Sequence, residues 1–214
     1  MTTVFIISAP SGSGKSTLVH QLLKTVPGMA FSVSYTTRPP RPSERPGVDY
    51  VFVTRNEFEE RVGRGEFLEY AEVFGHYYGT NRAAFESATH QGSDLVLDID
   101  VQGARQLKVA IPQAISIFVL PPSREVLEQR LRLRSQDSEE VIQRRLQGAV
   151  KEVQNYTHYD FVLINRNIEE ASARLAAIVN AERLRKARME EEVRPILQSF
   201  ASECLEETSV KESK

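Results

Sequence analysis

The chain has 214 residues, of which 41% are hydrophobic and 26% are charged, a composition that is ordinary for a soluble globular protein. Its formal net charge of -2 excludes the overall basic field that draws a protein to nucleic acid or to an anionic membrane, so we expect neither as a partner. The one cysteine, Cys204, cannot form an internal disulfide, and no apolar run reaches the length of a membrane span, so we expect a cytoplasmic location.

The first predicted element is a short buried strand, indicated by an apolar run at 4–7. It leads into the turn SAPSGSGKST at 8–17, after which residues 18–23 follow with helical spacing. A strand, a glycine-bearing turn and a helix in this order are the context of a phosphate-binding loop, in which backbone N–H groups point toward anionic oxygens.

Individual residues of this turn have the chemistry that phosphate binding needs. Gly12 and Gly14 let the backbone curl, Lys15 can reach terminal phosphates, and the Ser16 hydroxyl can bind Mg²⁺. The general pattern begins with glycine, and this chain has Ala9 there, so that position must tolerate a β-carbon. A chance turn rich in glycine and serine is the alternative interpretation.

Residues 34–80 have β character and separate the first strand–helix unit from the next one, so we interpret them as an inserted lobe. Strands are predicted at 31–35, 50–53, 66–70 and 73–78, with a helix at 56–64.

The loop at 36–47 contains four prolines and is therefore stiff and irregular. It carries Arg38, Arg41 and Arg45. The pattern leaves two interpretations equally open: a solvated connector with incidental charge, or a preformed arginine clamp for a phosphate.

A second buried strand, at 95–100, ends in acidic residues. Asp98 and Asp100 are two residues apart, so on a strand both would face the same side, at the edge where ligands gather in open α/β sheets. Paired carboxylates favour a cation between them, such as a magnesium nucleotide or an arginine. The alternative is that they cap the helix predicted to begin near Val101.

The second half of the chain continues the alternation of helices and strands. Helices are predicted at 102–110, from Ser123 to about 133, from a capping box at Asp137 and Glu140, and at 168–200, with strands at 114–120 and 161–164. Arg130 and Arg134 share one helix face, which predicts either a solvated charged surface or a mobile lid that brings arginines onto phosphate.

The ordered motifs of the chain resemble those of the guanylate kinases, over roughly residues 3–185. The matching blocks are SAPSGSGKST at 8–17, SYTTRPPR at 34–41, GVDY at 47–50, EYA at 69–71, YYGT at 77–80 and LDIDVQG at 97–103. The resemblance implies an α/β fold with a P-loop NTPase-type parallel sheet flanked by helices, an inserted α+β lobe and a short helical lid. It implies an enzyme that transfers the γ-phosphoryl group of ATP to GMP, and also to dGMP, with Mg²⁺ as cofactor.

The resemblance also assigns roles residue by residue. It implies catalytic roles for Lys15, Arg130, Arg134 and Arg145, which match the residues that stabilise the transferring phosphoryl group. The ATP-binding positions it implies are Ala9, Pro10, Ser11, Gly12, Ser13, Gly14, Lys15, Ser16, Thr17 and Asn165. The GMP-binding positions it implies are Ser34, Arg38, Arg41, Tyr50, Glu69, Tyr78, Thr80, Asp98 and Asp100. Ser16 is the expected Mg²⁺ ligand, with Asp98 or Asp100 acting through water.

The expected domains follow from the same comparison. They are a core of 1–33, 81–127 and 150–200, a GMP-binding lobe of 34–80, a lid of 128–149 and a flexible acidic tail of 201–214. The family's lid glycines are replaced here by Leu133 and Ser135, and its aspartate pair after the last strand by Arg166 and Asn167.

Two other functions compete with this interpretation. One is a non-catalytic guanylate-kinase-like interaction module, against which the intact Gly14-Lys15-Ser16 sequence argues. The other is a phosphate-loop kinase for a different monophosphate, against which Glu69 and Ser34 argue, because they match the guanine-reading residues.

Overall fold

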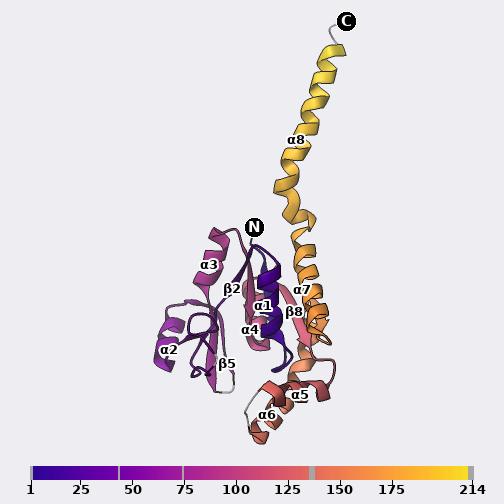
Figure 1. Cartoon of the computed structure of the whole chain (residues 1–214). Coiled ribbons are helices and arrows are strands. Elements are labelled where there is room, and N and C mark those ends of the chain that lie inside the picture. The colour runs from indigo at the N-terminus through magenta and orange to yellow at the C-terminus, as the bar shows by residue number, and fades with distance from the viewer. Residues whose placement is uncertain (1, 43, 74, 135–137, 212–214) are drawn as a thin grey trace. The chain divides into compact units, whose positions relative to one another are not determined.

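The computed structural model describes residues 2–42, 44–73, 75–134 and 138–211, and the side chains of Arg134 and of residues 201–211 lie outside that description. The chain divides into two units, Met1–Ala176 and Ala177–Lys214. The first unit contains two sheets, and most of the helices in the described part of the chain belong to it (Figure 1).

The main sheet has five strands, all parallel to their neighbours, as the sequence predicts. In spatial order they are β2 (Met29–Ser32), β7 (Asp94–Asp98), β1 (Val4–Ser8), β8 (Ile115–Leu120) and β9 (Phe161–Ile164). All five residues of the central strand β1 are buried, because a parallel sheet is covered by helices on both faces. Along the chain, β2 and β7 are added on one side of β1, and β8 and β9 on the other side. An open α/β sheet binds ligands beyond the carboxyl end of the strand at which this change of side occurs.

Helices alternate with these strands along the chain (Figure 1). They are α1 (Lys15–Thr25), α3 (Arg82–His90), α4 (Val101–Ala110), α5 (Arg124–Arg134), α6 (Glu139–Glu152), the 3-10 helix η1 (Val153–His158) and α7 (Ile168–Arg183). Of these, α1, α3 and α4 pack against the sheet. Leu18 and Leu22 of α1 and Leu107 of α4 are fully buried, as the apolar spacing of these helices requires.

A second sheet of four strands lies within residues 35–81 and extends one residue past the segment 34–80 that we interpreted as an inserted lobe. In spatial order its strands are β4 (Val51–Phe52), β3 (Tyr35–Thr36), β6 (His76–Asn81) and β5 (Phe67–Val73), and α2 (Arg55–Gly63) accompanies them. Phe58 of α2 is fully buried and stacks on Phe67 and Tyr77, with ring centroids 4.5 and 5.2 Å away. This aromatic cluster gives the four-stranded sheet a core of its own.

The helices α5 and α6 pack against each other through a small apolar cluster. Its members are Leu127, Leu131, Ile142, Leu146 and Ala149. Helix α6 has Ser138 as its N-cap, and the predicted capping residue Asp137 lies outside the described residues.

The predicted single helical stretch at 168–200 is in fact two helices, α7 and α8 (Lys186–Lys211). The N–H groups of Leu184 and Arg185 donate to carbonyls three residues back, at 3.2 and 3.4 Å, which is the tightened hydrogen bonding of a helix end. Helix α8 continues past Ala201, where we expected the acidic tail to begin.

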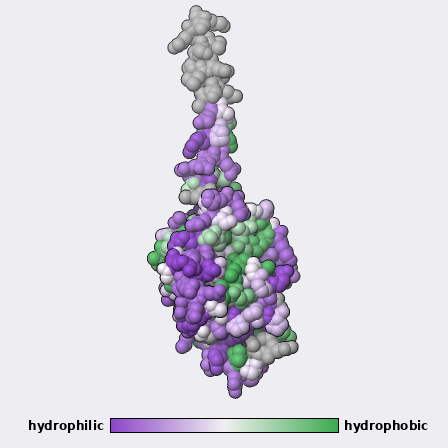
Figure 2. Space-filling model, turned by 90° about the vertical axis from the view of Figure 1, so that its left-hand side faces the viewer, coloured by the Kyte–Doolittle hydropathy of each residue, from purple (hydrophilic) through white to green (hydrophobic). Residues whose placement is uncertain are grey.

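The surface is mainly polar on the side of the molecule that Figure 2 shows, with one hydrophobic area near the middle. Among the described residues, no helix is both long enough and apolar enough to cross a membrane.

Candidate active site

The phosphate loop leaves strand β1 and enters helix α1, in the order that the sequence predicts. Gly12 and Gly14 have φ values of 90° and 89°, in the left-handed region that side chains disfavour. Neither position has room for a side chain, because a β-carbon would lie 2.8 Å from Leu131 at Gly12 and 2.5 Å from Asn165 at Gly14. Both glycines are therefore required by the backbone and by the neighbouring side chains.

Asp98 stands beside the phosphate loop because β7 pairs in parallel with β1, with Asp98 opposite Ile7. The Lys15 ammonium forms an ion pair with one Asp98 oxygen and donates to the Ile99 carbonyl at 3.0 Å. The Ser16 hydroxyl donates to the other Asp98 oxygen at 3.0 Å. The structure therefore joins the loop's cation, its hydroxyl and one of the two predicted acids.

Asp100 has a different environment from Asp98. The prediction that one strand carries both acids is wrong, because β7 ends at Asp98 and Asp100 is the N-cap of α4. Its carboxylate accepts the Gly103 N–H at 2.9 Å, so the capping interpretation holds for this residue. Asp100 is also close enough to Glu69 to raise the pKa of that carboxyl.

Glu69 is a buried carboxyl group in the second sheet. It pairs with Thr80 across strands β5 and β6, and the Thr80 hydroxyl donates to it at 2.6 Å. Only 5% of Glu69 is exposed, and this burial raises the pKa of its carboxyl to about 7. Ser34, a third predicted base-reading residue, is buried as well.

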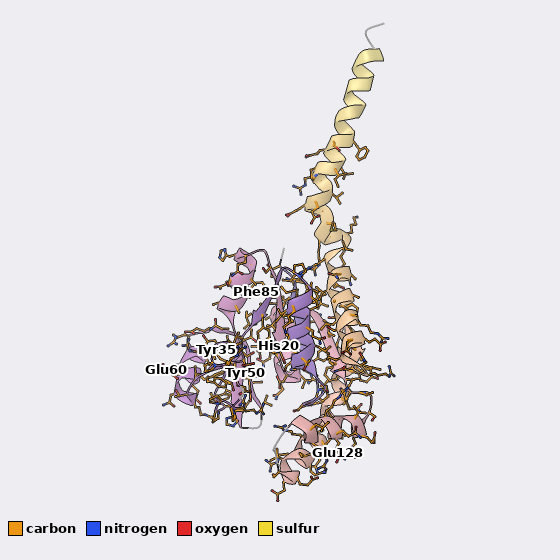
Figure 3. The ribbon with its side chains drawn as sticks, in the orientation of Figure 1. His20, Tyr35, Tyr50, Glu60, Phe85 and Glu128 are labelled. Carbon is orange, nitrogen blue, oxygen red and sulfur yellow. The ribbon has the colours of Figure 1, made fainter. Side chains whose placement is uncertain are left out.

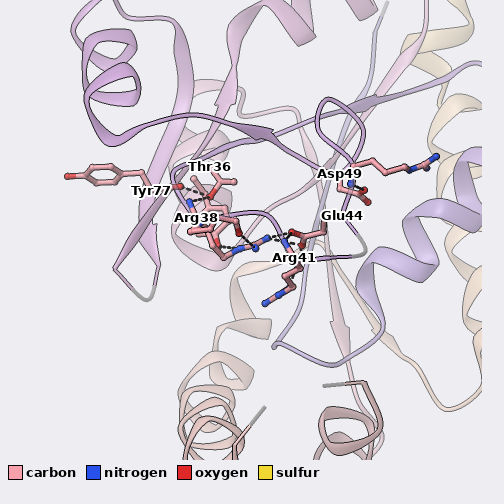
Figure 4. A network of polar contacts seen from close by, with 9 residues as sticks. Thr36, Arg38, Arg41, Glu44, Asp49 and Tyr77 are labelled. Atoms are coloured by element: carbon pink, nitrogen blue, oxygen red, sulfur yellow. Dashed lines mark hydrogen bonds and ion pairs between the residues drawn. The ribbon is translucent and has the colours of Figure 1, made fainter. Parts of the chain in front are cut away.

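The predicted arginine clamp forms a polar network at the start of the proline-rich loop (Figure 4). Arg38 donates to the Tyr78 hydroxyl at 3.2 Å and to both Glu44 oxygens at 2.7 and 2.9 Å. The Tyr50 ring lies under the Arg38 guanidinium, 5.4 Å from ring centroid to Cζ, and burial raises the pKa of the Tyr50 hydroxyl above its usual range. Arg41 remains half exposed.

One cleft of about 740 Å³ is lined by part of this set of residues. The phosphate loop and β7 contribute Ser16 and Asp98, the second sheet and its loops contribute Arg41 and Tyr50, and α6 contributes Arg145. His20 of α1 and Tyr50, both labelled in Figure 3, also line this cleft. Residues far apart in the sequence thus line a single space, and two arginines, Arg41 and Arg145, are among them.

Two further predicted residues, Arg130 and Asn165, lie beside the backbone of the phosphate loop. Arg130 donates to the backbone carbonyls of Asn165 and Ser13 at 2.9 and 3.4 Å. The Asn165 side-chain amide donates to the same Ser13 carbonyl at 2.8 Å, so it supports the loop from its buried side. The Arg134 side chain and Ser135 are outside the described part of the chain. Leu133, which stands where the family has a lid glycine, is 88% exposed.

Two carboxylates at the site were not anticipated. Glu44 joins Arg38 and Arg41, and Glu152, the last residue of α6, lies close to the backbone of Ser11 in the phosphate loop. Burial raises the pKa of the Glu152 carboxyl, and Lys15 opposes that shift. The arginines around Glu44 in the sequence are a signal that could have found it, whereas nothing local connects Glu152 with a loop 141 residues earlier.

A family model, two relatives and a solved structure that resemble this chain all belong to one family. A family model described as guanylate kinase matches residues 1–182. The guanylate kinase of Koribacter versatilis is 56% identical over 207 residues, which are 94% of this chain and 88% of that protein. The guanylate kinase of Escherichia coli K12 is 51% identical over 191 residues, which are 88% of this chain and 92% of that protein. The crystal structure of guanylate kinase from Anaplasma phagocytophilum superposes with a TM-score of 0.75 at 35% identity, covering 90% of this chain and 93% of that chain.

Proposed function

The chain belongs to the guanylate kinase family, and from this premise we propose that it transfers the γ-phosphoryl group of ATP to GMP, giving ADP and GDP. The observation that carries the proposal is one cleft whose lining combines residues of the phosphate loop with Arg41 and Tyr50 of the arginine network. Two phosphate-binding regions facing one space are what a transfer between two nucleotides needs.

The base preference is proposed to come from Glu69. A carboxylate can accept from guanine N1–H and from the 2-amino group together, whereas adenine lacks this pair of donors. Adenine would therefore leave a buried charge unpaired, which disfavours AMP. The 5% exposure of Glu69 and its short hydrogen bond from Thr80 support this assignment. We extend the proposal to dGMP, because the groups assigned to the acceptor contact its base and its phosphate rather than the ribose.

The chemistry requires no protein nucleophile. A phosphate oxygen of GMP forms the new bond to the γ-phosphorus of ATP as the bond from that phosphorus to the oxygen of ADP breaks. Lys15, Arg130, Arg134 and Arg145 are proposed to neutralise the charge on the transferring group, and Arg38, Arg41, Tyr50 and Tyr78 to hold the acceptor phosphate in line. We propose that 34–80 closes on GMP and 128–149 on ATP, so that water is excluded from the transfer.

The residues beside the phosphate loop fit a magnesium ion. Ser16 and Asp98 offer a hydroxyl and a carboxylate, the hard oxygen ligands that Mg²⁺ prefers, and ATP phosphates and water can complete the shell. Ser16 and Asp98 would hold the ion, which would supply positive charge that offsets the negative charge of the nucleotide phosphates. No group of three or more His, Cys, Asp or Glu side chains with metal-binding geometry occurs among the described residues, which accords with a site that relies on the nucleotide for ligands.

A single assay tests the function and its rivals. ADP release from ATP is measured with GMP, dGMP, AMP, CMP or UMP as acceptor, with and without Mg²⁺. We expect turnover with GMP and dGMP that depends on Mg²⁺. No GMP-dependent turnover would favour the non-catalytic module, and equal turnover of AMP would favour a kinase for other monophosphates. The cytoplasmic location, which we infer from the single cysteine, can be checked by cell fractionation.

A further inference from the structure

Glu44 occupies the centre of the arginine network, within the proline-rich loop (Figure 4). Its two oxygens accept from Arg38 Nη2 at 2.7 and 2.9 Å, and one of them also accepts the backbone N–H of Arg41 at 2.8 Å. One carboxylate therefore fixes both a guanidinium and the backbone of the loop beside it.

Arg38 needs an anionic partner in the free protein. Its side chain is only 14% exposed, and its surroundings include the rings of Tyr50 and Phe52, whose centroids lie 5.4 and 5.9 Å from Cζ. A cation buried against aromatic rings is costly unless an anion pairs with it. Glu44, itself 13% exposed, provides that anion.

The two arginines differ in how fully their side chains are engaged. All three nitrogens of the Arg38 guanidinium already donate within the protein: Nε to Tyr78, Nη1 to the Pro39 carbonyl at 2.6 Å, and Nη2 to Glu44. The Arg41 guanidinium is 51% exposed and lines the cleft, and its one ion pair within the described part of the chain is a long one, with Glu44 at 3.6 Å. Binding of an incoming phosphate to the Arg41 guanidinium therefore breaks fewer existing contacts than binding to Arg38 would.

We infer that Glu44 is a positioning residue for the acceptor phosphate. It holds the Arg38 guanidinium in place through an ion pair and holds the Arg41 backbone through a hydrogen bond. The Arg41 guanidinium is thereby left to bind the phosphate. This inference rests on the proposed function, because it assigns the network to the phosphate of the nucleoside monophosphate. Glu44 does not touch the reacting atoms and acts through the two arginines.

The test compares Glu44→Gln and Glu44→Asp with the wild-type protein in steady-state assays. Glutamine keeps the size of the side chain but removes its charge, and aspartate keeps the charge but is one methylene shorter. We expect Glu44→Gln to raise the KM for GMP about tenfold, with kcat and the KM for ATP within about twofold of wild type. Glu44→Asp is expected to restore part of the lost GMP affinity.

Glu59→Gln is the matched control, because Glu59 forms an exposed ion pair with Arg55 on α2, in the same sheet-and-helix segment. It should leave all three constants unchanged. An unchanged KM for GMP in Glu44→Gln would overturn the inference, and so would a lower one, which would make Glu44 a competitor of the phosphate. Loss of kcat and ATP affinity together with a lowered melting temperature would also overturn it, in favour of a purely structural role. Absence of GMP turnover in the wild-type protein would instead reject the proposed function.

Discussion

Glu69 and Thr80 lie directly opposite each other on strands β5 and β6, and the Thr80 hydroxyl donates to the Glu69 carboxylate at 2.6 Å. Eleven residues separate them in the sequence, and the antiparallel pairing of the two strands brings them together. Their hydrogen bond orients a carboxylate that the fold has taken out of water, which is a costly arrangement unless a ligand completes it.

The first prediction concerns the base preference. Glu69→Gln should raise the KM for GMP by about 10- to 100-fold, because a charged hydrogen-bond acceptor for guanine is lost. The KM for ATP should change little, and the ratio of GMP to AMP turnover should fall. Glu72→Gln, on the same strand but with a half-exposed side chain, is the control. An undiminished preference for GMP in the Glu69 variant would show that another group reads the base.

The second prediction concerns pH. Burial raises the pKa of Glu69 from 4.5 to about 7, and guanine donors can pair only with the ionised form. The ratio kcat/KM for GMP should therefore fall as the pH drops from about 8 to 6, with a midpoint near 7. The GMP phosphate titrates near pH 6, so the profile of Glu69→Gln provides the baseline to be subtracted. If kcat/KM for GMP depends on pH in the same way in both proteins, Glu69 does not cause the fall at low pH.

The raised pKa of Glu69 also predicts the pH dependence of stability. The folded free protein binds more protons than the unfolded chain between pH 4.5 and about 7, so this group's contribution to the free energy of unfolding falls as the pH rises through that window. Chemical denaturation at pH 5 and pH 8 should show a larger loss in the wild-type protein than in Glu69→Gln. The reverse difference would mean that the Glu69 pKa is depressed.

The third prediction concerns Lys15. Lys15→Met should lower kcat by at least about 100-fold, with a fall in melting temperature too small to account for that loss, because Asp98 loses its ion pair but keeps the hydrogen bond from Ser16. Lys24→Met, an exposed position on the same helix, should keep full activity. Retained phosphoryl transfer in Lys15→Met would remove Lys15 from the mechanism.

The fourth prediction separates backbone strain from steric clash in the phosphate loop. Gly14→Ala adds a β-carbon that lies 2.5 Å from the Asn165 amide at a φ of 89°, whereas Gly92→Ala meets nothing within 4 Å at a φ of 63°. Both variants should lose about 1–2 kcal/mol of stability through backbone strain. Only Gly14→Ala should also weaken ATP binding, measured by calorimetry, because Asn165 must move away from Ser13. Equal ATP affinity in the two variants would contradict this account.

Local patterns in the sequence were enough to predict the alternation of strands and helices, the parallel main sheet and the phosphate loop. They did not show that the predicted strand at 31–35 is divided between β2 and β3, in different sheets, or that the predicted helix at 168–200 is divided between α7 and α8. The patterns are an apolar run typical of a buried strand, two glycines before Lys15 and Ser16, and a helix directly after them. The sequence also named Glu69 and the clamp arginines, although only through resemblance, since the loop at 36–47 alone left a solvated connector equally open.

How these groups meet depends on packing between elements that are far apart in the sequence. Asp98 and Asp100 look equivalent in the sequence, but β7 ends between them, so one pairs with Lys15 and the other caps α4. Glu44 forms an ion pair with Arg38, and neither residue spacing nor periodicity in the sequence specifies this contact. Local periodicity records which face of an element is buried, whereas the pairing of charges across elements depends on strand register and helix packing, and those are set by the whole fold.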